Sequence, residues 1–80
     1  MARKTTKYFD SMRLREDRSD IEMDWIERVI LNADTTVIQA DSRIKKGGRI
    51  AESDGRFLRV ILLQDGETLH NAFFDRRFKP

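Results

Sequence analysis

The sequence predicts an α+β fold in which two N-terminal helices pack on one face of a four-stranded antiparallel meander sheet. Apolar residues recur at helical spacing only in the first 32 residues, and short β-branched or apolar runs separated by turn residues fill the remainder. Two of these runs flank Asp65-Gly66, a favoured hairpin turn, so we expect them to pair. A chain of 80 residues has the size of one small domain, which we expect to span residues 1–80.

The main helix is expected over residues 20–32. Ser19 and Glu22 have the spacing of a capping box, in which each side chain bonds the free amide of the other residue. The apolar side chains that follow form one stripe of a helix: Ile21, Trp25, Ile26, Val29 and Ile30. A shorter and less regular helix is expected over residues 7–17, where Tyr8, Phe9 and Met12 recur at helical spacing.

Four strands are expected over residues 35–39, 43–51, 56–64 and 67–74. The pair Gly47-Gly48 inside the second run indicates a bulge or a close approach of another group to the backbone. The third run is apolar enough to be a central strand.

The predicted hairpin sets a register in which Gln64 faces Glu67, and it assigns side chains to two faces. One face, expected beneath the main helix, carries Leu58, Val60, Leu62, Leu69, Asn71 and Phe73. The other carries Phe57, Arg59, Ile61, Leu63, Thr68, His70, Ala72 and Phe74. This second face is largely apolar for a surface exposed to solvent, which makes it the candidate binding surface.

Charge is distributed unevenly along the chain. The net charge of +2 arises from 16 basic and 14 acidic residues. Residues 1–18 carry +3, residues 19–41 carry −5 and residues 42–80 carry +4. The main helix is therefore acidic and the sheet region basic. We expect residues 1–6 to be a frayed basic start and residues 75–80 a basic tail.

Several classes of function are excluded or disfavoured by composition. The chain has no cysteine and one histidine, so we expect no metal site, and no phosphate-binding glycine loop suggests a cofactor. The longest apolar run spans residues 60–63, far short of the ~20 residues that cross a bilayer. We see no signal peptide and expect a cytoplasmic protein that does not enter membranes.

Two arginines suggest a phosphate site. If Glu52 faces Arg56, then Arg49 lies opposite Arg59, and two facing cations repel each other unless an anion bridges them. Lys45 and Lys46 add positive charge that attracts RNA, although lysines on an edge strand also discourage aggregation.

The order of these features resembles the BrnT-type toxins within the RelE-like ribonuclease superfamily. The resemblance covers roughly residues 12–75 and rests on the helix around Trp25, the strand at Arg49-Ile50, the strand over residues 55–61 and the closing residues 72–76. It implies a helix pair on an antiparallel sheet, cleavage of RNA without a metal, and a small antitoxin as partner.

On this hypothesis Arg49 and Arg59 hold the phosphate while His70 moves protons, because the pKa of an unperturbed histidine lies near neutrality. The alternative for His70 is a surface histidine that packs on Ile61. The alternative for the whole face is a non-catalytic interaction surface, centred on Phe57, Ile61 and Phe74, for a protein partner or for a second copy in a homodimer.

Overall fold

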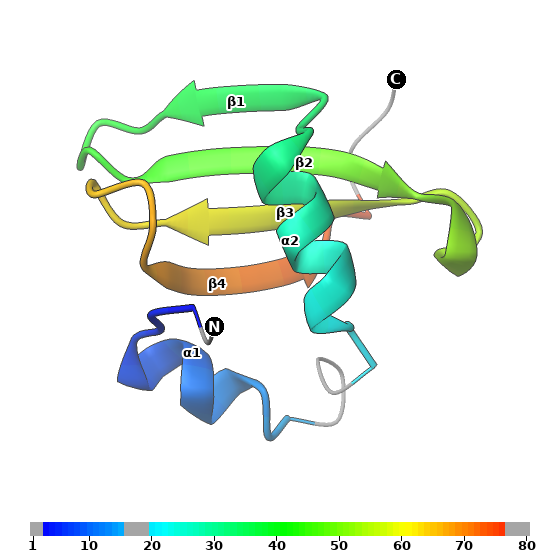
Figure 1. Ribbon diagram of the computed structural model, residues 1–80, viewed down its shortest axis with the longest axis horizontal. Coiled ribbons are helices and arrows are strands. Elements are labelled where there is room, and N and C mark those ends of the chain that lie inside the picture. Colours follow the sequence, from blue (N-terminus) through cyan, green and yellow to red (C-terminus); the bar gives the residue numbers. More distant parts are fainter. Residues whose placement is uncertain (1–2, 16–19, 77–80) are drawn as a thin grey trace.

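The computed structural model describes residues 3–15 and 20–76 (Figure 1). Within them lie helices α1 (Lys7–Met12) and α2 (Met23–Leu31), and a short 3-10 helix, η1 (Ala51–Ser53). The strands are β1 (Thr35–Ile38), β2 (Ile44–Ile50), β3 (Arg56–Leu62) and β4 (Leu69–Phe74). They form one antiparallel sheet in the order β1-β2-β3-β4. This arrangement confirms the predicted α+β class and the four-stranded antiparallel meander.

The two helices occupy different places on the sheet. α2 crosses one face, over β2 and β3, whereas α1 lies beside β4 at the edge of the sheet (Figure 1). Phe9 of α1 nevertheless reaches the core that α2 covers. Both helices are shorter than expected, and α1 ends at Met12. Glu22 is the N-cap of α2 but its side chain caps no amide there, and Ser19 of the predicted capping box lies outside the described residues.

The core lies between α2 and the sheet. Alternate residues of β3, namely Leu58, Val60 and Leu62, are fully buried there, as their predicted face requires. Ile26 and Val29 cover them from α2. Neither helix in the described part of the chain is long and apolar enough to cross a lipid bilayer.

The register of β2 with β3 differs from the prediction. Ile50 faces Arg56, so Arg49 lies opposite Phe57 and Gly47 lies opposite Arg59. The predicted Arg49–Arg59 pair is therefore wrong. The reason is the connection, because η1 is followed by two residues with positive φ and the amide of Gly55 bonds the carbonyl of Ile50 at 2.9 Å.

A β-bulge changes the faces of β4. Leu62 faces Leu69, as predicted, but Ile61 then faces Asn71, so His70 is an extra residue on β4. Beyond His70 the predicted faces are therefore exchanged. Phe74 and Ala72, expected on the outer face, lie under α2, where Phe74 meets Trp25 with ring centroids 6.2 Å apart. Asn71 and Phe73 point to the opposite side.

Residues 3–6 are not frayed, because they pair with the outer edge of β4. Thr5 forms a parallel bridge with Leu69, whose carbonyl accepts from the amide of Thr6 at 3.1 Å and whose amide donates to the carbonyl of Lys4 at 2.8 Å. Arg3 forms an ion pair with Glu27 of α2. Of the predicted basic tail at residues 75–80, residues 77–80 lie outside the described part.

Gly47 and Gly48 differ in the space that the structure leaves for an added side chain. A Cβ at Gly47 would lie 2.4 Å from the ring of Phe57, which is buried, whereas a Cβ at Gly48 would meet Val29 at an ordinary 3.5 Å. We expect Gly47→Ala to lower the free energy of unfolding by about 1–3 kcal/mol, measured by urea denaturation. Gly48→Ala is the matched control and should be tolerated. Equal stability of the two variants would contradict the close packing of Phe57 on Gly47.

Candidate nucleic-acid interface

The face of the sheet away from α2 is called the open face below. It carries Lys45, Gly47 and Arg49 of β2, Phe57, Arg59 and Ile61 of β3, and Asn71 and Phe73 of β4. Among the described residues, no helix crosses this face. Phe57 and Ile61 are buried even so, because neighbouring side chains on the open face pack over them.

One end of the open face is hollowed into a pocket of about 470 Å³. We call it the open-face pocket; it is lined by Tyr8, Gln39, Arg43, Lys45, Ile61, His70, Asn71 and Phe73. These residues come from α1, from the connection between β1 and β2, and from the strands β2, β3 and β4. Cationic, aromatic and amide side chains thus surround one concave site that is open to solvent.

His70 occupies the wall of this pocket next to α1. Its Nδ1 lies 3.0 Å from the hydroxyl of Thr6, and its ring stacks on Tyr8 with centroids 4.9 Å apart and planes at 26°. Burial, with a smaller contribution from the positive charge of Arg43, holds the pKa of His70 below its usual value of 6.5, although Asp41 acts in the opposite direction. The imidazole is therefore mainly neutral at pH 7.

The hydrogen bond to Thr6 positions the imidazole of His70. The hydroxyl oxygen of Thr6 already accepts from the amide of Phe9 at 3.1 Å, as the N-cap of α1. A hydroxyl oxygen has a second lone pair and carries its own proton, so Thr6 can bond Nδ1 in either neutral tautomer of His70. In both tautomers Nδ1 is directed at Thr6, and this hydrogen bond orients the ring.

Arg59 belongs to a different cluster on the open face. Its Nε donates to Asp75 at 3.1 Å, and its guanidinium covers the ring of Phe57 at 4.7 Å from the centroid. It also donates to the hydroxyl of Thr35 at 3.3 Å. Arg59 does not line the open-face pocket. Arg49, farther along β2, donates to the carbonyl of Gly55 at 3.2 Å.

The other predicted site residues are divided between the two faces. Lys45 lines the open-face pocket, whereas Lys46 points to the helix side, where its Nζ donates to the carbonyl of Ile30 at 2.9 Å. That position favours a cation because it is the C-terminal end of α2. Phe74 lies on the helix side too, beneath Arg56 at 4.0 Å. Phe57, Ile61 and Phe74 therefore do not share one surface.

The sequence prediction missed the residues that make the site a pocket. The spacing in the sequence places Tyr8 among the apolar residues of the shorter helix, and the predicted register places Asn71 and Phe73 on the helix side of the sheet. Asn71 carried a usable signal, because an amide in the middle of a buried strand face costs free energy unless it is bonded. A bulge just before Asn71 removes that cost.

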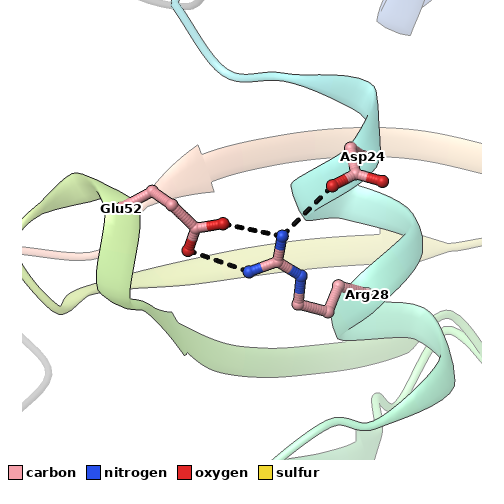
Figure 2. A network of polar contacts seen from close by, with 3 residues as sticks. All are labelled: Asp24, Arg28 and Glu52. Atoms are coloured by element: carbon pink, nitrogen blue, oxygen red, sulfur yellow. Dashed lines mark hydrogen bonds and ion pairs between the residues drawn. The ribbon is translucent and has the colours of Figure 1, made fainter.

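A polar network on the helix side of the protein is separate from the pocket (Figure 2). Arg28 of α2 donates to both carboxylate oxygens of Glu52 in η1, at 2.9 and 2.8 Å, and to Asp24 at 3.1 Å. All three side chains are exposed to solvent. The network joins α2 to the β2–β3 connection and offers no concave site.

Comparison with protein-family models, with curated proteins and with solved structures gives no match for this chain. Across residues 3–15 and 20–76, no three histidine or carboxylate side chains gather in a way that could hold a metal ion.

The Arg28–Glu52 pair predicts a specific acid sensitivity. Hydrogen bonds from Arg28 and from the backbone lower the pKa of Glu52 from 4.5 to about 2. Since the folded pKa is the lower one, the stabilisation is present above pH 4.5 and is lost as the pH falls towards 2. We expect Glu52→Gln to lower the melting temperature slightly at pH 7, with the difference from the original protein vanishing near pH 2. Asp54→Asn, on the same connection, is the control, and a pH-independent difference for Glu52→Gln would contradict the assignment.

Proposed function

We propose that this protein binds single-stranded RNA on the open face, with one or two nucleotides in the open-face pocket. The observation that carries the proposal is the combination, around one pocket, of two cations, three aromatic rings and two amides. Proteins that bind single strands use this combination, because the cations attract phosphates and the rings stack on bases. The resemblance to RelE-like ribonucleases suggests the same class of ligand.

Arg43 and Lys45 are the groups suited to phosphate. Both side chains are half-buried at the pocket, so an anion bound there is partly shielded from water. Arg43 has Asp41 as its neighbour at 3.6 Å, with both side chains exposed by about half. Such an exposed pair contributes little stability, and the guanidinium can exchange the carboxylate for a phosphate at small cost.

Tyr8, His70 and Phe73 are the groups suited to bases. Tyr8 is 51% exposed although it stacks on His70, so part of its ring remains open to a ligand. Phe73 is half-buried on β4 and lies next to Asn71, whose amide can bond the polar edge of a stacked base. In the tautomer that carries its proton on Nε2, His70 adds a hydrogen-bond donor for a phosphate or carbonyl oxygen.

A single strand fits this site better than a duplex. Bases must be unstacked to lie on aromatic side chains, and the rings of Tyr8, His70 and Phe73 line this one pocket. RNA recognition by sheet surfaces commonly uses such exposed rings.

We place binding before cleavage because the proposed catalytic groups lie apart. Arg59 is engaged with Asp75 outside the pocket, and Nδ1 of His70 is engaged with the hydroxyl of Thr6. In cleavage, the ribose 2′-hydroxyl would lose its proton to a base and attack the adjacent phosphorus to form a 2′,3′-cyclic phosphate, while the 5′ oxygen leaves with the electrons of the broken P–O bond and takes a proton from an acid. No described carboxylate lines the pocket to serve in place of His70.

Binding is tested with a fluorescent oligouridine followed by anisotropy at several salt concentrations. Replacing both Arg43 and Lys45 by Ala should weaken binding and reduce the slope of log K against log salt by about 1.4, two contacts at about 0.7 each. Phe73→Ala should weaken binding by about 5- to 150-fold through lost stacking, about 1–3 kcal/mol, without that change in slope. Lys46→Ala, on the same strand but the helix side, is the control.

Equal affinity for all of these proteins, or a loss as large for Lys46→Ala, would contradict the proposed surface.

The relation to cleavage is tested with the same RNA. We expect the protein and its His70→Ala variant to leave the RNA equally intact over hours, as judged by denaturing gels. Cleavage by the original protein that His70→Ala abolishes would instead make the site catalytic.

A further inference from the structure

The two edges of the sheet are treated differently. Along β4, residues 4–6 form hydrogen bonds with Leu69 and α1 packs next to the strand, so this edge is covered (Figure 1). At the other edge, β1 has a neighbour on one side only among the described residues, namely β2. An uncovered edge presents unpaired backbone donors and acceptors to another chain.

The edge at β1 lacks the features that usually prevent pairing between molecules. Residues 35–40 are uncharged in a chain in which 38% of residues are charged, and they contain no proline. Val37 is 50% exposed and Ile38 is 72% exposed. Charged residues, prolines and bulges are the common protections of an edge strand, and β1 has none of them.

The hydrogen-bond pattern shows which backbone groups of β1 point outward. The amide of Gln39 donates to the carbonyl of Arg43 at 2.8 Å. In an antiparallel pair every second residue bonds the neighbouring strand, so Val37, two residues earlier, is also directed towards β2. The amides and carbonyls of Thr36 and Ile38 are therefore directed away from the sheet.

We propose that a second copy of this chain pairs with β1 to form a continuous antiparallel sheet across a two-fold axis. The outward groups of Thr36 would bond those of Ile38 in the second copy, and two such pairs flank Val37, which faces itself at the axis. This register places apolar side chains opposite apolar or threonine side chains. A shift by two residues would place Ile38 opposite Asp34, which is charged.

A second copy suits this edge because the two-fold axis also joins exposed apolar groups on the helix side. Leu31, the last residue of α2, is 75% exposed and precedes β1 by four positions. An antiparallel copy brings its own Ile38 to the beginning of β1, and so towards Leu31. Ile38 lies on this same side, opposite Ile44 of β2. The contact between Ile38 of one copy and Leu31 of the other thus occurs twice, once on each side of the axis.

The size of the contact predicts a weak and reversible dimer. Four strand residues and one helix residue from each copy bury less surface than the 1,200–2,000 Å² of a standard interface. We therefore expect a monomer at low concentration and a dimer at about 0.1–1 mM.

Single-cysteine variants test the pairing, because the chain contains no cysteine of its own. Facing residues of a non-hydrogen-bonded antiparallel pair have Cβ atoms about 4.5–5.5 Å apart, close enough for a disulfide after a small adjustment. Under mild oxidation, Val37→Cys should give a covalent dimer at least tenfold faster than Leu14→Cys, a control on an exposed residue of the N-terminal region. Thr36→Cys should behave like the control, because Thr36 does not face itself.

Sedimentation of the uncrosslinked protein provides an independent measurement. The original protein should show a rising mass up to 1 mM, and Val37→Lys should remain monomeric while Leu14→Lys associates as the original does; amide spectra confirm that each variant is folded. A protein that stays monomeric at 1 mM, with Val37→Cys no faster than Leu14→Cys, would overturn the proposal. Faster crosslinking of Thr36→Cys than of Val37→Cys would also overturn it, since it would place the axis elsewhere.

Discussion

The single extra residue at His70 determines the use of both faces of the sheet. Without this bulge, Asn71 would lie under α2 and Phe74 would face outward. A buried amide without a partner costs about 1–3 kcal/mol, and an exposed phenylalanine would remove apolar surface from a small core. With the bulge, Ala72 and Phe74 complete the core while Asn71 and Phe73 reach the open face. The same residue thus stabilises the fold and forms the pocket.

The order of elements and the buried face of β3 were predictable because they depend on local patterns. Hydrophobic spacing identified α2, and alternation identified Leu58, Val60 and Leu62 as buried. The registers were less predictable, because one residue in a connection or a strand exchanges every side chain beyond it. Residues 51–55 shifted Arg49 away from Arg59, and the bulge exchanged the faces of Phe73 and Phe74.

A related reason explains why only part of the candidate site could be predicted from the sequence. His70 and Ile61 are expected on the outer face and Lys45 is expected to attract RNA, and all three line the open-face pocket, since His70 is the bulged residue itself and the other two lie on other strands. Tyr8 and Arg43 required knowledge of tertiary structure. Tyr8 reaches His70 only because residues 4–6 pair with β4 and thereby place α1 at that edge. No periodicity in the sequence encodes that long-range contact.

The burial of Phe57 and Ile61 on the open face follows from the size of the domain. A chain of 80 residues has enough helix to cover one face of its sheet, so apolar residues on the other face must be covered by their neighbours. Phe57 packs on Gly47 beneath the guanidinium of Arg59, which Asp75 holds in place. Arg59 therefore shields apolar surface in addition to its charge interactions. At the other end Ile61 forms part of the open-face pocket, which is bordered by rings and cations, a surface suited to a flat and anionic ligand.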